Sequence, residues 1–248
     1  MEDELKITAV IPVKGDSSRL KNKNILPFGD SNLLIHKIRQ LKQVAELARI
    51  IVSSDSEEML QMAREEGVEA IKRPKQYADE SQPFGYFLEY ICDTINTEHL
   101  MWACCTSPMV EPDLYREAIR KYREGLLAGY DSLITVQKYQ HFLLDENGPM
   151  NFRRGISHVN SQDLPVYHYF TNGIILVPRE NVRKWKYHFG PQVYRMEIAQ
   201  NESIDIDTYY DYVIAKAFYE DKQKLTWGGV NPKYLSSIMY TVVCREAA

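Results

Sequence analysis

The chain has 248 residues, of which 44% are hydrophobic and 26% are charged, as in an ordinary globular protein. Its net charge of −4 argues against a general nucleic-acid binder. No apolar run approaches the ~20 residues of a membrane span, and the acidic N-terminus lacks the chemistry of a signal peptide. Four cysteines form neither metal spacing nor a disulfide framework, so we expect reduced thiols in a cytoplasmic protein: Cys92, Cys104, Cys105 and Cys244.

The first half of the chain alternates between expected strands and expected helices. Apolar, β-branched runs predict buried strands, and apolar residues at helical spacing predict amphipathic helices. The expected strands are 7–13, 49–54, 68–71, 100–105 and 132–136, and the expected helices are 33–47, 57–66, 83–95 and 112–128. Repeated strand–helix units of this kind predict a parallel sheet with helices on both faces.

A basic loop follows the first expected strand. It is rich in Gly, Asp, Ser and Asn and carries four cations, which are Lys14, Arg19, Lys21 and Lys23. Backbone N–H groups in such a loop can point at phosphate oxygens, while Lys and Arg supply charge. The loop matches neither the Walker A nor the dinucleotide fingerprint. A phosphate site is the functional interpretation, and a solvated surface loop is the alternative.

The regular pattern stops after residue 136. Residues 139–170 are irregular and aromatic, with a hairpin turn expected at 143–148. This segment is interpreted as an arm that packs on a second subunit, or alternatively as a local flap over the site. A strand is expected at 171–178, and helices are expected from 179 and over 209–219. No linker is visible, so we expect a single domain over 1–248, and segment 226–248 carries no functional signal.

A second chemical signal lies at Asp205 and Asp207, which alternate with two isoleucines. Strand alternation would place both carboxylates on one face, where a hard divalent cation such as Mg²⁺ would relieve their repulsion. Thr208 and Asp211 offer another interpretation, because their spacing is that of a helix N-terminal cap.

Four blocks in order resemble one family, the cytidylyltransferases that activate acidic sugars. This is the CMP-sialic acid synthetase (acylneuraminate cytidylyltransferase) group, with relatives that act on other nonulosonates and on Kdo. The blocks are 11–24, 51–55 with Arg73-Pro74 downstream, 106–108 and 202–208, joined by Leu164-Pro165 and Asn172-Gly173. The resemblance implies a three-layer α/β/α mononucleotide-binding (Rossmann-like) nucleotidyltransferase fold, with 139–170 as a small dimerisation arm in a homodimer.

The resemblance also implies roles for individual residues. CMP would pass from CTP to a nonulosonate-like sugar acid for surface-glycan synthesis, with release of pyrophosphate and with Mg²⁺ held by Asp205 and Asp207. Asn172 would line the sugar pocket, and Arg73 would read the edge of the base. The expected nucleotide-binding residues are Lys14, Ser17, Arg19, Lys23, Asn24 and Arg73, and the expected catalytic residues are Lys23, Asp205 and Asp207.

Several positions of the phosphate loop depart from the family pattern. Lys14 stands for an arginine and loses bidentate geometry, Asp16 for a glycine, Ser18 for a lysine and Lys21 for a proline. These changes keep open a different nucleotide or a sugar phosphate as substrate, or a non-catalytic nucleotide-binding homologue. The retained aspartate pair argues against the non-catalytic alternative.

The sugar side departs further from the pattern. Cys104-Cys105 replaces the Gln-Pro before Thr106, and Ser161 stands where an arginine is expected to bind the sugar carboxylate. We therefore expect an acidic sugar related to sialic acid but not N-acetylneuraminate itself.

Overall fold

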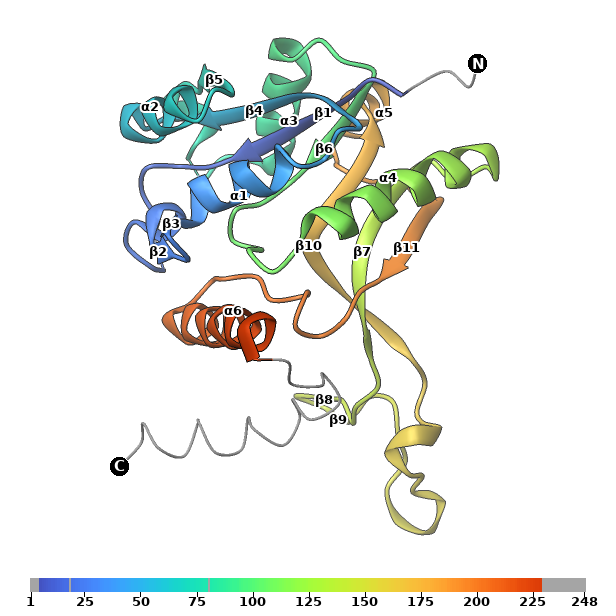
Figure 1. Cartoon of the computed structure of the whole chain (residues 1–248). Coiled ribbons are helices and arrows are strands. Elements are labelled where there is room, and N and C mark those ends of the chain that lie inside the picture. Colours follow the sequence, from blue (N-terminus) through green and yellow to red (C-terminus); the bar gives the residue numbers. More distant parts are fainter. Residues whose placement is uncertain (1–4, 18, 80, 229–248) are drawn as a thin grey trace.

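A seven-stranded sheet forms the centre of the molecule (Figure 1). The computed structural model describes residues 5–17, 19–79 and 81–228, so the expectations for Ser18, Cys244 and segment 229–248 lie outside the described residues. Across the sheet the strands are β11 (Val193–Glu197), β7 (Ser132–Tyr139), β10 (Tyr167–Pro178), β6 (His99–Trp102), β1 (Ile7–Pro12), β4 (Leu47–Ser54) and β5 (Glu69–Lys72). Two short hairpins pair β2 (Pro27–Phe28) with β3 (Ser31–Asn32) and β8 (Leu144–Asp145) with β9 (Gly148–Pro149).

The expectation of an all-parallel sheet is wrong at one strand. β10 runs antiparallel to both of its neighbours, β6 and β7, whereas the other paired strands of this sheet are parallel. The physical reason is the connection from β7 to β10, which turns back through the irregular segment instead of crossing over through a helix. The sequence did not predict the edge strand β11, because its five residues, VYRME, include only one that is buried and so show no apolar run.

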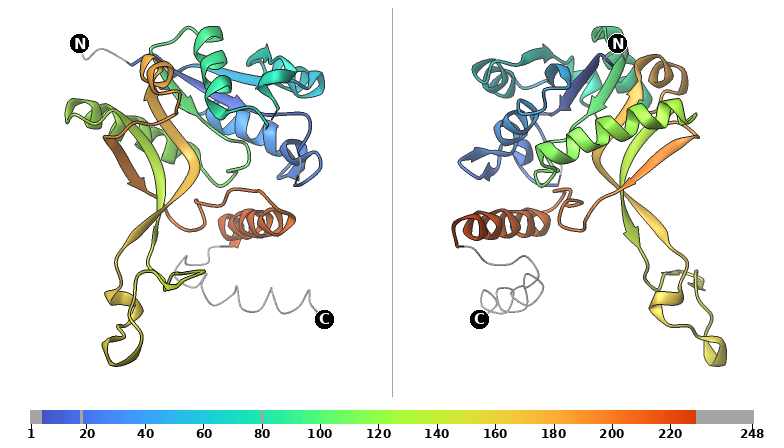
Figure 2. Two further views of the ribbon diagram at one scale, coloured as in Figure 1. Left: turned by 180° about the vertical axis from the view of Figure 1, so that it is seen from behind. Right: turned by 45° about the vertical axis from the view of Figure 1, so that its right-hand side comes forward.

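Helices cover both faces of the sheet (Figure 2). They are α1 (Leu33–Leu41), α2 (Glu57–Glu65), α3 (Phe84–Thr94), α4 (Pro112–Leu127), α5 (Arg179–Trp185) and α6 (Tyr209–Gly228). One hydrophobic core contains residues of α1, α2, α4 and α6, and a second contains residues of α3 and α5. The expected three-layer α/β/α arrangement is therefore confirmed. None of the helices described here is both long and apolar enough to span a membrane.

Strand alternation divides the buried side chains between these two cores. Ile7, Ala9 and Ile11 of β1 face the core of α1 and α4, whereas Val10 faces the core of α3 and α5. A continuous apolar strand is thus buried on both faces, as in other open α/β sheets. The helix expected over 33–47 ends at Leu41, because the chain turns there to bury Val44 and to start β4 at Leu47.

The irregular segment 140–166 extends from the ends of β7 and β10, away from the helical layers (Figure 1). The expected hairpin is present as β8 and β9. The segment is held by its own contacts, since Phe142 stacks on His158 with ring centroids 5.0 Å apart and Gln140 Nε2 donates to the backbone of Gln162 and Leu164. We refer to residues 140–166 as the arm.

The strand order sets the position of the site. From β1 the chain moves outward to β4 and β5 and then crosses to the other side of β1 as β6. The loops after β1 and β6 therefore diverge at the carboxyl edge of the sheet, where open α/β sheets bind ligands.

Arg179 supports this architecture from the first turn of α5. Its guanidinium donates to the carbonyl oxygens of Cys92 and Ile95, at 3.4 and 3.2 Å, at the C-terminal end of α3. We expect Arg179→Met to lower the free energy of unfolding by about 1–2 kcal/mol, because carbonyl groups at the negative end of the helix lose a cationic partner.

Denaturant unfolding checks this prediction. The matched control is Arg120→Met, which removes an exposed arginine whose partner is Glu124 at 2.7 Å within the same helix. That change should alter stability by less than about 0.5 kcal/mol. Equal effects of the two substitutions would contradict the capping role of Arg179.

Candidate active site

A cavity of about 380 Å³ opens at the carboxyl edge of β1 and β6. Its lining comes from three parts of the chain: the loop after β1, the segment that leads from β5 into α3, and the residues that follow β6. The first of these contributes five expected nucleotide-binding residues, Lys14, Ser17, Arg19, Lys23 and Asn24, and the second contributes Arg73. The structure thus gathers around one cavity all six residues expected to bind the nucleotide.

The loop after β1 is fixed by its neighbours. The backbone N–H of Gly15 donates to Asp55 Oδ1 at 2.9 Å, at the end of β4. A Cβ atom at Gly15 would lie 3.1 Å from Cβ of Ser56, so this close approach favours glycine. Asn22 adopts the left-handed conformation, with φ 54°, just before the short 3₁₀ turn that begins at Lys23. These contacts hold the loop open toward the cavity.

Asn24 joins this loop to the segment after β6. Its Nδ2 donates to the carbonyl oxygen of Lys14 at 3.0 Å, and its Oδ1 accepts from the thiol of Cys105 at 3.3 Å. Burial raises the pKa of Cys105 to about 12, so the thiol stays protonated and remains a donor. The observed contacts of Asn24 are therefore structural, although the residue lines the cavity.

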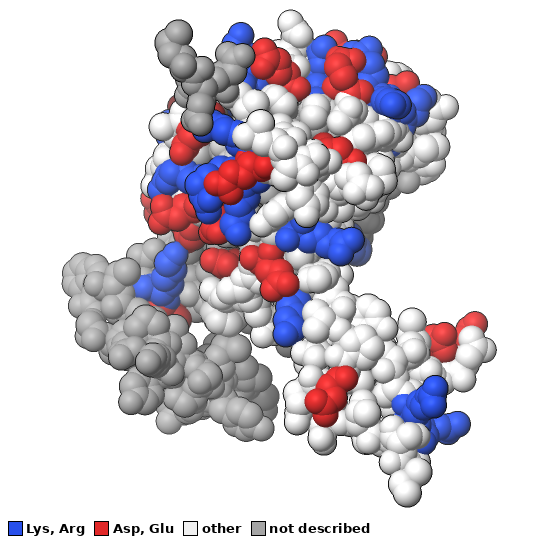
Figure 3. Space-filling model, turned by 90° about the vertical axis from the view of Figure 1, so that its right-hand side faces the viewer, with Lys and Arg blue, Asp and Glu red and all other residues white. Residues whose placement is uncertain are grey.

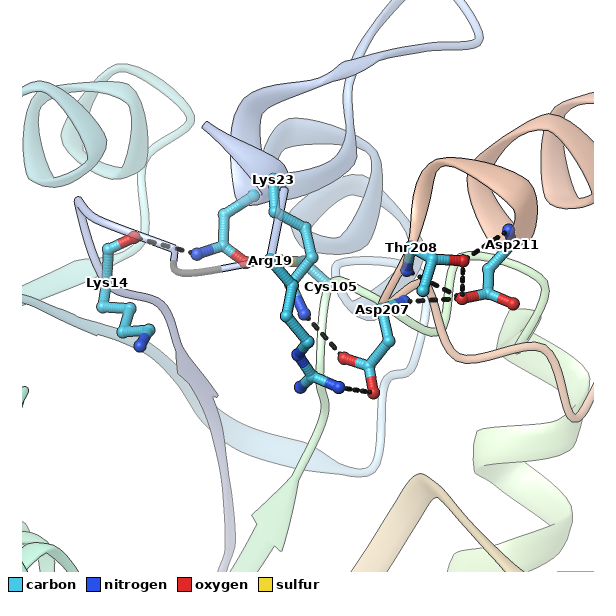
Figure 4. A network of polar contacts seen from close by, with 8 residues as sticks. Lys14, Arg19, Lys23, Cys105, Asp207, Thr208 and Asp211 are labelled. Atoms are coloured by element: carbon cyan, nitrogen blue, oxygen red, sulfur yellow. Dashed lines mark hydrogen bonds and ion pairs between the residues drawn. The ribbon is translucent and has the colours of Figure 1, made fainter. Parts of the chain in front are cut away.

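Two loop cations meet Asp207 (Figure 4). Arg19 donates to Oδ2 of Asp207 at 2.7 Å, and Lys23 Nζ donates to Oδ1 at 2.9 Å. Partial burial acts to raise the pKa of Asp207, but the hydrogen bonds and charges of Lys23 and Arg19 outweigh it and lower that pKa. Asp207 is therefore an ionised carboxylate at the edge of the cavity.

Asp205 lies in a different environment. Its Oδ1 is buried without a hydrogen-bond partner among the described residues. Burial raises the pKa of Asp205, and the negative charge of Asp207 acts in the same direction. Side-chain hydrogen bonds from Thr106 and Asn172 oppose this shift only in part. A buried carboxylate oxygen without a donor is well suited to accept a cation.

The segment that carries both aspartates forms no part of any described strand, so the expected alternation on a strand face is wrong. Residues 204–207 form an extended connection between β11 and α6, fixed by a bond from the N–H of Ile206 to the carbonyl oxygen of Thr106 at 2.8 Å. The cap at the start of α6 is formed by a different carboxylate, that of Asp211. Asp211 Oδ2 accepts from the backbone N–H groups of Asp207 and Thr208 at 3.1 and 2.8 Å. The helix-cap interpretation is therefore confirmed for Asp211, and metal binding by Asp205 and Asp207 stays a prediction.

The donor set is compatible with Mg²⁺. Among the described residues no group of three or more His, Cys, Asp and Glu side chains could hold a metal. Mg²⁺ commonly uses only one or two carboxylates and completes its octahedron with water and substrate phosphates. Oδ1 of Asp205, which has no partner among the described residues, and the partly exposed carboxylate of Asp207 fit that pattern. Both ligands are carboxylates, which suit Mg²⁺.

Arg73 is buried beneath the opposite side of the cavity. Its guanidinium donates to the carbonyl oxygen of Val13 and lies 4.8 Å from the ring centroid of Phe87. Its Nε is buried without a partner among the described residues. Burial lowers the pKa of Arg73, but an arginine remains charged at neutral pH. A held guanidinium with an unused donor can present a fixed hydrogen-bond pattern to a ligand.

Asn172 occupies an irregularity in β10. It has a positive φ of 55°, in a stretch where the register of β10 against β7 shifts between Phe170 and Ile175. Asn tolerates this conformation better than most residues, and the shift directs its side chain to Asp205. Asn172 is not among the residues that line the cavity, so the structure brings it to the aspartates and not to the loop cations.

The departures from the family pattern have distinct positions. Asp16 and Lys21 are exposed and lie outside the cavity lining, so the added negative charge does not face the cavity. Cys104 lines the cavity. Ser161 lies exposed on the arm, and the three described cysteines are free.

Aromatic side chains on the far wall escaped the sequence analysis as site residues. Tyr77, Phe84, Tyr86 and Phe87 all line the cavity, and Phe84 and Tyr86 keep 46% and 55% of their surface exposed. The signal that could have identified them is the spacing of Phe84 and Phe87 in the first turn of α3. Exposed aromatic rings beside a polar cavity are typical of ligand sites.

A family model described as Cytidylyltransferase matches residues 8–226. The N-acylneuraminate cytidylyltransferase of Escherichia coli is 26% identical over 88% of this chain, and the chain covers 53% of that protein. The pseudaminic acid cytidylyltransferase of Campylobacter jejuni is 23% identical over 87% of this chain, with 97% of its own length covered. The chain therefore spans about half the length of the first relative and nearly all of the second.

Solved structures share the fold. A CMP:2-keto-3-deoxy-manno-octonic acid synthetase complexed with CTP has a TM-score of 0.64 at 15% identity, covering 88% of this chain and 99% of its own. A 4-diphosphocytidyl-2C-methyl-D-erythritol synthase from Anaerococcus prevotii has a TM-score of 0.62 at 13% identity, covering 88% and 100%. With the family match over most of its length, the chain belongs to the cytidylyltransferase family.

Proposed function

We propose that this protein transfers CMP from CTP to an acidic, nonulosonate-like sugar and releases pyrophosphate. The names of the Escherichia coli and Campylobacter jejuni relatives support this class of substrate. The observation that carries the proposal is the unpartnered Oδ1 of Asp205, which lies outside the cavity lining but adjoins Thr106 on its wall. Four cations line this cavity: Lys14, Arg19, Lys23 and Arg73. A site for a nucleoside triphosphate with its metal ion has this composition.

The nucleotide would lie across the cavity from phosphate loop to aromatic wall. Lys14, Arg19 and Lys23 would neutralise the triphosphate, and Ser17 would donate its hydroxyl to it. Arg73, which lines the other side of the cavity, would read the edge of cytosine through its guanidinium. Developing charge on the phosphate oxygens and on the departing pyrophosphate would be stabilised by these fixed cations.

Asp205 and Asp207 would hold Mg²⁺, which when bound supplies positive charge to the triphosphate. Arg19 and Lys23, which pair with Asp207 in the structure, would also be able to bind phosphate oxygens of the triphosphate. In the structure without substrate, the carboxylate of Asp207 offsets part of the charge of these two cations. The hydroxyl of the sugar attacks the α-phosphorus, and alignment within the cavity contributes much of the rate.

The sugar would bind near Asn172, Thr106 and Cys104, at the side of the cavity where the sequence departs from the family. Cys104 offers no amide to the sugar, and burial raises its pKa to about 12, which keeps it neutral. We therefore propose a related acidic sugar rather than N-acetylneuraminate as the substrate, for surface-glycan synthesis.

The arm would pack on a second copy of the chain to form a cytoplasmic homodimer. Residues 1–248, including the arm, would form one catalytic domain. Large apolar side chains of the arm are exposed, and its surface is mostly uncharged (Figure 3): Leu144 is 65%, Met150 61% and Ile156 109% exposed. Apolar groups gathered on a projecting segment are typical of an interface.

The first test measures pyrophosphate release with Mg²⁺, using each of four nucleoside triphosphates and a panel of acidic sugars. We expect turnover with CTP and one sugar other than N-acetylneuraminate. Asp205→Asn should lower kcat/KM by about 100-fold or more, because a charged metal ligand stabilises the transition state by several kcal/mol. Removal of Mg²⁺ with a chelator should have the same effect on the wild-type enzyme.

Asp211→Asn is the matched control. It changes a carboxylate four residues beyond Asp207 whose contacts serve the start of α6, so kcat/KM should fall far less than with Asp205→Asn. Efficient turnover of N-acetylneuraminate would refute the proposed sugar class. Binding of CTP without any pyrophosphate release across a full sugar panel would favour a non-catalytic role.

The second test concerns the base. Arg73→Lys should reduce the preference for CTP over UTP in kcat/KM by about tenfold, because a lysine cannot reproduce the fixed donors of a guanidinium. Competition between the two nucleotides measures this ratio directly. An unchanged preference would assign base recognition to other groups of the cavity.

The third test concerns the arm. Ile156→Asp should raise the dissociation constant of the homodimer by about tenfold or more, because a charge would be buried at the interface. Sedimentation over a range of concentrations gives this constant. Leu127→Asp changes a residue that is 87% exposed at the end of α4 and should leave dimerisation unchanged. A wild-type chain that stays monomeric would favour the flap interpretation.

A further inference from the structure

Lys37 on α1 is a completely buried lysine that the sequence analysis did not single out. Its side chain is 0% exposed, and its Nζ donates to the carbonyl oxygens of Ser107 and Val110 at 2.9 and 3.2 Å. Nζ also lies 2.9 Å from the hydroxyl of Tyr115, on α4. Lysine is almost never buried unless it is paired, so these three partners require an explanation.

The partners satisfy Lys37 in either protonation state. An ammonium group donates to all three oxygens, whereas a neutral amine donates to the two carbonyls and accepts the proton of the Tyr115 hydroxyl. Burial lowers the pKa of Lys37 to about 7, although the neighbouring Cys105, Glu111 and Cys104 act in the opposite direction. The contacts therefore persist on both sides of neutral pH.

Two neighbours of Lys37 bind the same loop. Gln40 Nε2 donates to the carbonyl oxygen of Pro108 at 2.8 Å, and His36 Nε2 lies 3.3 Å from the same oxygen. One face of α1 thus binds three backbone carbonyls of loop 107–110, the connection between β6 and α4. We name His36, Lys37 and Gln40 the α1 clamp.

The clamped loop adjoins the aspartate segment. Thr106 immediately precedes it and accepts at its carbonyl oxygen from the N–H of Ile206, the residue after Asp205, at 2.8 Å. The side chain of Thr106 also acts to lower the pKa of Asp205. The loop is also tied back to the end of β6, since the N–H of Ser107 donates to the carbonyl oxygen of Cys104 at 3.2 Å. A displacement of Ser107 would therefore move Thr106, and with it the environment of Asp205.

A lysine is needed at this place because the carbonyls face the interior. Removing its amine would leave Ser107 and Val110 with buried acceptors, which the loop could satisfy only by shifting toward water. The amine is long enough to reach both from one Cα position. Outer contacts of this kind commonly set the orientation of metal ligands.

We propose that Lys37 is a positioning residue that holds Asp205 in its metal-binding geometry through loop 107–110 and Thr106. The inference rests on the proposed role of Asp205 in binding Mg²⁺, and it assigns to α1 a part in the site that lies outside the cavity lining. Lys37 itself touches neither substrate nor metal in this proposal.

The test uses Lys37→Met in the full chain, with two readouts. The half-saturating Mg²⁺ concentration for pyrophosphate release should rise about tenfold, the lower end of the range for outer contacts of metal ligands. In the ligand-free protein, amide exchange should show about tenfold lower protection of the Ile206 N–H, whereas the N–H of Ala103, bonded to Val10, should keep its protection. The milder Tyr115→Phe, which removes one of the three partners, should shift both readouts in the same direction by less.

Tyr122→Phe is the matched control for lost stability. Tyr122 is on α4, the helix that also carries Tyr115. Its hydroxyl lies 2.9 Å from Nδ1 of His99, at the start of β6 and away from the cavity. The substitution should lower stability without changing the Mg²⁺ requirement or the exchange of Ile206. If Lys37→Met behaves like Tyr122→Phe in both readouts, the positioning role is overturned. A wild-type enzyme without Mg²⁺-dependent turnover would overturn the proposed function, while the exchange readout would still decide whether Lys37 positions the aspartate segment.

Discussion

Asp207 accepts hydrogen bonds from Arg19 and Lys23, which lie 188 and 184 residues away in the sequence. This charged contact joins the loop after β1 to the segment before α6 at the carboxyl edge of the sheet. Neither side would be stable in this arrangement alone: four cations would repel within one loop, and two carboxylates would repel within four residues. Their proximity lets Asp207 offset part of the positive charge of the loop.

The two aspartates differ although they are two residues apart. Asp207 is half-exposed and paired with cations, so its pKa is lowered, whereas burial raises that of Asp205. Environment and not residue type separates them, as in other sites built on two carboxylates. Asp207 is already paired with two cations, whereas Oδ1 of Asp205 is buried without a partner among the described residues. A divalent cation would correct that imbalance, which is why the metal proposal depends more on Asp205 than on Asp207.

The site also depends on supports that bind no ligand. Asp55 fixes Gly15, Asn24 ties the first loop to Cys105, and the α1 clamp holds the loop after β6. Each contact joins segments far apart in the sequence through a buried or half-buried polar group. Such groups are costly when unpaired, so each one restricts the loops to a single arrangement. The antiparallel β10 contributes in the same way, because its bulge at Asn172 directs a side chain toward Asp205.

The sequence by itself determined the layers and the family. Local patterns predicted the first strands and helices, because apolar periodicity records which faces are buried. Four short blocks identified the family and predicted the nucleotide side of the site. Tertiary structure decided what local patterns do not encode. It reversed β10, placed residues 204–207 outside the strands and paired Asp207 with Arg19 and Lys23. It also buried Lys37, which in the sequence is one more polar position on an amphipathic helix. These features depend on contacts between distant segments, whose energies no short window of sequence contains.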